Sequence, residues 1–378
     1  MSNSDKKRVL FIQPAFGHYR YALFELLHKN HDVTFIFIRN MSEYPSSISP
    51  NPEWNMFFLN RERNHFWLLK LAHLIFQLKP DVIITSINGS YQSIASLIMG
   101  RILKIPVILW SLTWDTSRFR SSHPSWKNFQ RETRIRWTTK NADAIVAGGT
   151  QARKFNQQIA PEGKPIFTAY QSTLDQFLMM KEHAYSNSRS SGSKPTILYL
   201  SRIVMFKGLD ILIRAFSEIE KNMAAHLIVA GEGPFLRHCE MLAKQLALRN
   251  ISFYGEIQNE DCWKLYNKAD IFVLPCSGKN GTEAWGLVIN EATSMGLPIV
   301  TTDAVGAVGD LVQDGVNGYV VKAGSTSALR VAIEKLLSDD SLRDRMGKES
   351  RKLFDSINSY EKMYDGFHNA ILSITQGH

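Results

Sequence analysis

Two carboxylates and two cations in the second half of the chain have the residue types and spacing of a ligand site. Glu283 and Glu291 flank an apolar stretch in EAWGLVINE, and Arg202 and Lys207 lie in SRIVMFKG. Burying an unpaired carboxylate costs several kcal/mol, which is comparable to the stability of a whole domain. A cation or a ligand is therefore expected to meet these carboxylates if they are buried.

The residues around Gly286 predict a short helix that begins near this glycine and ends at Gly296. Residues 287–289 predict an apolar, buried first turn, and the free N–H groups at such a helix end suit a phosphate. Glu283 would lie in the loop ahead of the helix and Glu291 about one turn inside it. The two would then flank an anion site and accept hydrogen bonds from sugar hydroxyls. In the simpler alternative, Glu291 only favours the helix dipole and Glu283 is solvated.

The two cations are predicted to lie in one loop. Arg202 would follow the strand TILYL, and Lys207 would directly precede Gly208, which opens the next helix. An arginine fork and a lysine point charge beneath a helix N-terminus can grip a diphosphate. Basic residues are common in loops, so the pair is weak evidence alone. Combined with the two carboxylates, it predicts a site for a nucleotide-diphosphate sugar.

Alternating apolar runs and helical patterns predict the elements that position these residues. The runs RVLFIQP, DVTFIFI, DVIITS, PVILWS, ADAIVAGG and PIFTAY are separated by segments of helical length. Such continuous apolar strands are typical of parallel sheets covered on both faces. Residues 1–175 are therefore expected to form a Rossmann-like, doubly wound domain.

The same pattern restarts after a Ser/Gly/Lys-rich segment, 176–195, which is predicted to be a linker. Residues 196–355 are expected to form a second Rossmann-like domain, and a C-terminal helix, 356–378, to pack back toward the first. The predicted fold class is α/β, with two doubly wound domains facing a central cleft. Ligands in such sheets bind at the carboxyl ends of the strands.

Other patterns disfavour several classes of protein. The turn VAGEGPF has Gly231 and Gly233 but Leu236 where a dinucleotide fingerprint needs a third glycine. No Asp-x-Asp occurs, so a carboxylate cage for Mg²⁺ or Mn²⁺ is unsupported. Three scattered cysteines among 378 residues favour a reducing cytoplasm over a disulfide framework. No apolar run reaches the roughly 18 residues of a spanning helix.

Positive charge is concentrated in the first domain. Residues 1–175 carry 22 Lys and Arg against 12 Asp and Glu, a net +10, whereas the remaining 22 basic and 23 acidic residues nearly cancel. The basic excess includes SRFRSSHPSWKNFQRETRIRWTTK, which interleaves cations with Phe119, Trp126, Phe129 and Trp137. A helix from about Pro124 could lie on an anionic membrane or grip a lipid diphosphate, or it could simply present a solvated face. The run HFWLLKLAHLIFQL is a second membrane candidate, for which a buried core helix is favoured.

The motif order resembles the retaining glycosyltransferases of family 4, which have the two-domain GT-B fold. The motifs are a strand followed by SR-x4-KG, then VAGEGP, YGEI, two glutamates with seven residues between them, and DGVNGYVV. The similarity is densest over about Thr196 to Ile333, and the first domain matches mainly in layout. The resemblance implies that the second domain holds a nucleotide sugar, UDP- or GDP-linked, and that the basic first domain holds the acceptor.

The resemblance also implies roles for single residues. Arg202 and Lys207 would bind the diphosphate and offset the charge of the leaving group, and Glu283 would hold hydroxyls of the donor sugar. The other donor-side residues would be the amides of Gly286, Leu287 and Val288 for phosphate and sugar, Glu291 for ribose, Ile257 near the base, and Gly17 after the first strand. On the acceptor side, His18 and Arg20 would face the cleft, and Trp114 and Asp115 stand where many members have a histidine.

The implied reaction retains the anomeric configuration, uses the donor's own phosphate as the base, and needs no metal or other cofactor. The implied acceptor is a membrane-associated, lipid-linked saccharide or a polysaccharide intermediate, and the protein would be cytoplasmic, with peripheral contact to the inner face of an anionic membrane. An inactive GT-B scaffold and a soluble enzyme acting on a small-molecule acceptor remain alternatives. A nucleic-acid partner is disfavoured because no recognised binding module appears.

Overall fold

The structure is a computed structural model that describes residues 6–39, 50–61, 66–115, 126–175, 178, 180, 194–279 and 281–375. The chain divides into two compact units. Unit 1 contains the described residues up to Ser172 and those from Ser359 onward, and unit 2 runs from Thr173 to Asn358. The expected boundaries were residues 175 and 355. In the structure, the first boundary, at Ser172, lies three residues earlier and the second, at Asn358, lies three residues later. The expected linker, 176–195, lies almost entirely outside the described residues.

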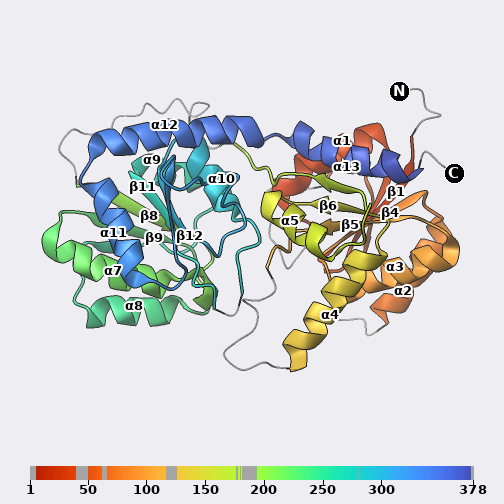
Figure 1. Ribbon diagram of the computed structural model, residues 1–378, viewed down its shortest axis with the longest axis horizontal. Coiled ribbons are helices and arrows are strands. Elements are labelled where there is room, and N and C mark those ends of the chain that lie inside the picture. Colours follow the sequence, from red (N-terminus) through yellow and green to blue (C-terminus); the bar gives the residue numbers. More distant parts are fainter. Residues whose placement is uncertain are drawn as a thin grey trace. The chain divides into compact units, whose positions relative to one another are not determined.

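Unit 1 is built on a parallel sheet of seven strands in the order β3-β2-β1-β4-β5-β6-β7 (Figure 1). Its strands are β1 (Arg8–Gln13), β2 (Asp32–Phe37), β3 (Asn55–Phe58), β4 (Val82–Ser86), β5 (Val107–Ser111), β6 (Ala144–Ala147) and β7 (Ile166–Thr168). The apolar runs predicted every strand except β3. This edge strand was not predicted although its sequence, NMFF, is largely apolar; it has only four residues and is half-buried at three of them.

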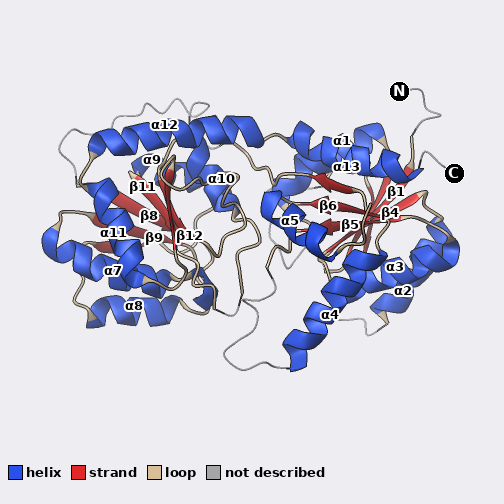
Figure 2. Cartoon of the chain, viewed as in Figure 1, coloured by secondary structure: helices blue, strands red, loops and turns tan. Residues whose placement is uncertain are grey.

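Helices cover both faces of this sheet (Figure 2). They are α1 (Tyr21–Asn30), α2 (Trp67–Leu78), α3 (Tyr91–Leu103), α4 (Trp126–Asn141), α5 (Thr150–Ile159) and α13 (Tyr360–Thr375). Alternate residues of β1 enter different cores, since Phe11 packs with α1 and α13, and Ile12 packs with α2. The C-terminal helix α13 is part of unit 1, where the Phe367 ring lies 5.0 Å from that of Trp110.

The expected core helix in the run HFWLLKLAHLIFQL is α2, and its buried side is as predicted. Leu71, Leu74 and Ile75 are buried in the core of unit 1. The opposite side is apolar too, because Leu69 is 67% exposed and Phe76 is 56% exposed. No helix in the described part of the chain combines the length and the hydropathy needed to cross a membrane.

Unit 2 contains a parallel sheet of six strands in the order β10-β9-β8-β11-β12-β13. Its strands are β8 (Thr196–Leu200), β9 (His226–Ala230), β10 (Ile251–Phe253), β11 (Ile271–Leu274), β12 (Ile299–Thr302) and β13 (Gly318–Val321). Its helices are α7 (Leu209–Asn222), α8 (Leu236–Gln245), α9 (Cys262–Lys268), α10 (Leu287–Ser294), α11 (Thr326–Leu337) and α12 (Asp340–Ile357). The prediction of two doubly wound parallel α/β sheets is confirmed.

Candidate functional site

The strand order of unit 2 reverses at β8, which lies between β9 and β11. Loops on the two sides of such a switch point run in opposite directions and leave room for a ligand at the carboxyl ends of the strands. The loop after β8 carries SRIVMFKG, and the segment after β11 carries the first glutamate of the opening motif. The predicted site residues of unit 2 are therefore concentrated at this edge.

Lys207 and Glu283 form an ion pair that joins these two loops. Lys207 ends a short 3-10 turn, Met205–Lys207, and is only 8% exposed. A buried ammonium needs a counter-charge, and the carboxylate of Glu283 provides one. The cation that was expected to meet a buried carboxylate is therefore, for Glu283, Lys207 from the loop after β8.

Backbone contacts hold the β8 loop against the residues that follow β11. The Ser277 N–H donates to the Phe206 carbonyl oxygen over 2.8 Å, and the Ser277 hydroxyl donates to the same oxygen over 3.3 Å. Gly208 has φ +73°, and a Cβ at this position would lie 2.0 Å from the carbonyl oxygen of Pro275. Only glycine permits this approach, which brings Lys207 to the segment that leads to Glu283.

Glu283 is itself anchored by the loop after β12. Its N–H donates to the Ala304 carbonyl oxygen over 2.9 Å, and its carbonyl oxygen accepts from Gly306 N–H over 2.9 Å. Nearby, Cys276 is fully buried, and burial raises the pKa of its thiol to about 12. The thiol therefore stays protonated at neutral pH and is a poor nucleophile.

Helix α10 begins as predicted, directly after Gly286. This residue caps the helix with φ 96° and ψ 70°, a left-handed conformation that disfavours other residues. The helix ends at Ser294, two residues before Gly296. The expectation of a buried first turn was only partly right, because Leu287 and Val288 are half-buried and Ile289 is fully buried. Leu287 and Val288, at the start of α10, thus keep part of their surface exposed.

Glu291 has a partner that no sequence pattern indicated. The Tyr266 hydroxyl, from α9, donates to Glu291 Oε2 over 2.7 Å. Burial raises the pKa of Glu291 to about 7, although the hydrogen bond from Tyr266 opposes that rise. Tyr266 lies in a helix whose pattern indicates only packing, so its role depends on the tertiary fold.

Two further residues that were predicted on the donor side follow β8 and β10, which lie on either side of β9 in the sheet. Arg202 comes two residues after β8 and is exposed, and Ile257 lies in the loop after β10 and is half-buried. An exposed guanidinium needs no protein counter-ion, and it can reorient toward an anion. The two residues lie after different strands, and both belong to the carboxyl edge that carries Lys207.

The predicted residues of unit 1 lie after β1 and β5. Gly17 accepts a hydrogen bond from Arg20 N–H over 2.9 Å in the turn before α1. His18 lies in that turn, but its side chain is not among the described ones. Trp114 and Asp115 follow β5 and are half-buried. These loops carry no motif as specific as the one in unit 2.

Arg20 is the best-defined of these side chains. It is 8% exposed, and its guanidinium carbon lies 3.9 Å from the centroid of the Trp110 ring. Its Nη2 donates weakly to Gln171 Oε1 over 3.4 Å, and burial lowers the pKa of Arg20. Stacking on aromatic faces compensates part of the lost hydration of such a cation.

Helix α4 carries the described part of the basic, aromatic segment. Trp126, Phe129 and Trp137 are 69%, 66% and 38% exposed, respectively, and they repeat on one side of the helix. Arg134 does not join this exposed set, because its Nε donates to the Gly89 carbonyl oxygen over 3.0 Å. Residues 116–125, including Phe119, lie outside the described residues. Trp137 also lines a groove of about 500 Å³ with Ile98 and other residues of α3.

No group of three or more His, Cys, Asp or Glu side chains that could hold a metal ion occurs among the described residues. The polar groups at the edge of unit 2 are instead one ion pair, an exposed arginine, a carboxylate and the start of a helix. Such a set suits an anionic ligand that also carries hydroxyl groups.

The fold of the whole chain matches that of a sucrose-phosphate synthase from Thermosynechococcus elongatus, with a TM-score of 0.77 over 99% of this chain and 100% of the other, at 18% identity. Two doubly wound parallel sheets in one chain, with this likeness, define the GT-B fold. Residues 181–353 match the family model described as "Glycosyl transferases group 1". Over these residues, slightly less than half of its length, the chain is similar to this family, which is also known as glycosyltransferase family 4.

Two characterised relatives illustrate the similarity. An alpha-D-kanosaminyltransferase of Streptomyces kanamyceticus is 28% identical over 274 residues, which cover 68% of this chain and 67% of that protein. A GDP-mannose-dependent alpha-(1-6)-phosphatidylinositol monomannoside mannosyltransferase of Mycolicibacterium smegmatis is 32% identical over 165 residues, which cover 42% of this chain. The second match spans only 43% of the length of that mannosyltransferase.

Proposed function

We propose that the protein is a retaining, metal-independent glycosyltransferase that moves a sugar from a nucleotide-diphosphate sugar to an acceptor hydroxyl. The observation that carries this proposal is the Lys207–Glu283 ion pair at the start of α10. It joins a cation that suits a diphosphate to a carboxylate that suits sugar hydroxyls, beside a helix N-terminus. The match of residues 181–353 to the glycosyltransferase family model and the GDP-mannose dependence of one relative support the same conclusion.

Each donor-side residue then has a chemical role. Lys207 has three N–H donors, so it can keep its bond to Glu283 while it binds the diphosphate, and Arg202 can approach from the surface. The amides of Gly286, Leu287 and Val288 lie at the positive end of α10 and meet phosphate and sugar. Glu291 accepts from the ribose hydroxyls, and Ile257 lies near the base.

Catalysis on this proposal depends on positioning and charge stabilisation. The bond between the anomeric carbon and the diphosphate breaks through an oxocarbenium-like state, and the acceptor oxygen attacks the same face. The donor's phosphate takes the proton of the acceptor hydroxyl. Arg202, Lys207 and the α10 N-terminus stabilise the departing diphosphate. Glu283, already paired with Lys207, holds sugar hydroxyls and does not act as a nucleophile.

The acceptor side is assigned to unit 1, with His18, Arg20, Trp114 and Asp115 as its residues, whereas Gly17 is assigned to the donor. We propose a lipid-linked saccharide as the acceptor, because α4 combines exposed aromatic rings with the exposed cations Lys127, Arg131, Arg136 and Lys140. Such a helix face suits an anionic lipid surface. The mannosyltransferase relative, whose name specifies a phosphatidylinositol mannoside acceptor, supports this choice.

Two experiments test these assignments. A panel of UDP-, GDP- and ADP-sugars should include one donor that the protein hydrolyses slowly or transfers, and failure with every donor would contradict the enzyme proposal. Sedimentation should show binding to anionic vesicles at low salt and release at high salt, because screening weakens surface attraction. Equal binding to neutral vesicles, or unchanged binding of a Trp126→Ala/Phe129→Ala variant, would contradict the membrane assignment.

A further inference from the structure

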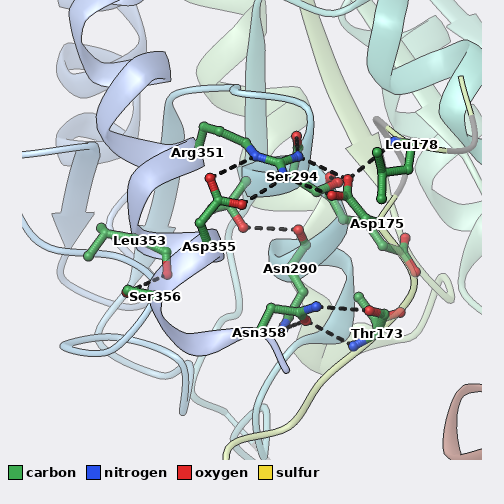
Figure 3. Close-up of polar contacts among 12 residues, drawn as sticks. Thr173, Asp175, Leu178, Asn290, Ser294, Arg351, Leu353, Asp355, Ser356 and Asn358 are labelled. Carbon is green, nitrogen blue, oxygen red and sulfur yellow. Dashed lines mark hydrogen bonds and ion pairs between the residues drawn. The ribbon is translucent and has the colours of Figure 1, made fainter. Parts of the chain in front are cut away.

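Within the described residues, the chain passes between the two units after Ser172 and after Asn358, and these two crossing segments are tied together by side chains. On the unit 2 side, Asn358 Oδ1 accepts from Thr173 N–H over 2.9 Å, and Asn358 Nδ2 donates to the Thr173 carbonyl oxygen over 3.0 Å (Figure 3). On the unit 1 side, the Ser172 hydroxyl donates to the Ser359 carbonyl oxygen over 3.0 Å and accepts from Ser359 N–H. One segment thus cannot rearrange without disturbing the other.

A second amide connects this pair to helix α10. Asn290 Nδ2 donates to Asn358 Oδ1 over 3.0 Å, and Asn290 Oδ1 accepts from Trp285 Nε1 over 2.8 Å. Asn290 has no exposed surface, and Trp285 is 3% exposed. Trp285 lies between Glu283 and Gly286, in the loop that begins the donor site. An unbroken hydrogen-bonded chain therefore runs from this loop to both crossing segments.

The side-chain amide orientations of Asn290 and Asn358 in this hydrogen-bonded series follow from the Trp285 indole. A tryptophan N–H can only donate, so the oxygen of Asn290 must face Trp285 and its nitrogen must face Asn358. The oxygen of Asn358 must then face Asn290, which leaves its nitrogen for the carbonyl of Thr173. Each bond is defined by the one before it, and loss of a single member leaves a buried polar atom without its partner.

The other end of α10 contacts the same crossing segment. Arg351 Nη1 donates to the Ser294 carbonyl oxygen over 2.9 Å. The same guanidinium binds both carboxylate oxygens of Asp175, over 3.0 and 2.7 Å (Figure 3). The middle of α10, at Asn290, and its C-terminal end, at Ser294, are therefore both linked to the segment that begins at Thr173. A displacement of α10 would therefore strain or break the hydrogen bonds that link it to the crossing segment.

Asparagine is an unfavourable residue inside a helix, and a buried amide contributes little unless its hydrogen bonds are made. An apolar side chain at residue 290 would fill the same space without these requirements. The amide instead gives α10 a directional link to the crossing. This makes Asn290 more than a packing residue of a short helix.

We propose that Asn290 and Asn358 are positioning residues that couple nucleotide binding at the start of α10 to the order of the two crossing segments. This inference rests on the proposed function, since it needs a nucleotide at the donor site. By linkage, a nucleotide that orders Trp285 and α10 also stabilises the Thr173–Asn358 pair, and the pair favours nucleotide binding by the same factor.

Hydrogen exchange of the full chain, with and without saturating UDP or GDP, tests the coupling. Calorimetry first establishes which nucleotide binds. We expect the bound nucleotide to slow exchange at least about twofold in the peptides that contain Thr173 and Ser359. Asn358→Ala and Asn290→Ala should each abolish this nucleotide-dependent difference. Asn358→Ala, which lies away from the donor loop, should change the nucleotide Kd by less than about threefold.

A matched control separates coupling from general destabilisation. Asn317 is also fully buried in unit 2, where its amide donates to the Leu311 carbonyl and the Ser350 hydroxyl. These bonds are not part of the hydrogen-bonded series that includes Asn290 and Asn358. Asn317→Ala should raise exchange generally yet keep the nucleotide-dependent difference. In steady state, Asn290→Ala should lower kcat more than it raises the donor KM.

Three outcomes would overturn the inference. The first is a nucleotide that binds to the wild-type protein without changing exchange in the crossing peptides, and this measurement needs no variant to fold. The second is a nucleotide-dependent difference that persists in both asparagine variants. If no nucleoside diphosphate binds at all, the proposed function fails and the coupling fails with it.

Discussion

The two units share a topology but differ at the carboxyl edges of their sheets. In unit 2, the loops after β8, β11 and β12 are joined by the Lys207–Glu283 ion pair, by close backbone approach at Gly208 and by hydrogen bonds to Glu283. In unit 1, the best-defined cation of the predicted site is Arg20, which stacks on Trp110 and donates weakly to Gln171. The edge of unit 2 is thus pre-organised around opposite charges, and that of unit 1 around an aromatic platform.

This difference matches two kinds of ligand recognition. A diphosphate sugar presents the same charges and hydroxyls in every turnover, so a rigid, charge-matched edge stabilises the same departing group each time. The name of one relative specifies a phosphatidylinositol monomannoside acceptor, and the name of the other specifies no acceptor. A less specific edge in unit 1 is consistent with the weaker sequence signal there.

Removing either charge of the Lys207–Glu283 ion pair should have the largest effect. Lys207→Ala and Glu283→Ala should each lower sugar transfer by at least about tenfold without unfolding the protein, because charge stabilisation of the diphosphate or the position of the sugar is lost. Steady-state kinetics and circular dichroism measure the two quantities. Lys221→Ala, which removes an exposed pair with Glu218, is the control. A transfer rate near that of the wild type in either site variant would remove these residues from the mechanism.

Backbone approach at Gly208 should make unit 2 sensitive to a single methyl group. Gly208→Ala should destabilise the protein by more than about 2 kcal/mol in urea unfolding, since its Cβ would clash with the Pro275 carbonyl. Gly163 in unit 1 has a similar φ of +76°, but its Cβ would meet nothing within 4 Å. Gly163→Ala should therefore cost only about 1 kcal/mol, for the backbone alone. Equal losses of unfolding free energy in the two variants would show that the added methyl group at residue 208 does not clash with the Pro275 carbonyl.

Glu291 should give unit 2 a pH dependence near neutrality. Its folded pKa of about 7 lies above the ordinary value of 4.5, so the folded state holds a proton that the unfolded state loses. Stability should therefore decrease as pH rises from about 4.5 to about 7. Nucleotide affinity should change in the opposite direction, weakening up to about tenfold as pH falls from 8 to 6, because the carboxylate is the better acceptor for ribose hydroxyls.

Variants of Tyr266 and Glu291 test whether the pKa of Glu291 sets the pH dependence of nucleotide affinity. Tyr266→Phe removes the hydrogen bond that lowers the pKa of Glu291, so the pH midpoint of nucleotide affinity should move upward. Glu291→Gln should make the affinity independent of pH over this range. Calorimetric titrations at several pH values measure both. A midpoint that stays in place in Tyr266→Phe would contradict the assigned hydrogen bond.

His31 should give unit 1 a pH dependence of the opposite sign. Burial and the neighbouring His368, whose Nδ1 lies 3.2 Å from His31 Nε2, lower the pKa of His31 to about 4. The unfolded state then binds the extra proton, so stability is present above pH 6.5 and is lost as pH falls toward 4. We expect a fall of a few degrees in Tm over this range, and a smaller fall in His31→Gln. An identical pH profile in the variant would contradict the assignment.

The site was partly predictable from local pattern. Gly286 marks the start of α10 because its left-handed conformation favours glycine, and this preference is visible in the sequence. Arg202 and Lys207 follow an apolar strand, so their place at the edge of a parallel sheet was also predictable. The partners of these residues were not. Tyr266 and Asn358 approach α10 only after helices far apart in the chain have packed together.

The order of apolar runs and helical patterns by itself determined two parallel sheets with buried faces, because periodicity and chain connectivity leave few other ways to bury those strands. It also determined which loops carry charge. Only the tertiary structure decided that Lys207 neutralises Glu283, that Tyr266 binds Glu291, and that Asn290 connects the donor loop to the chain crossings. Charge and hydrogen-bond pairing depend on distances of a few ångströms between segments distant in sequence, and no local pattern specifies those distances.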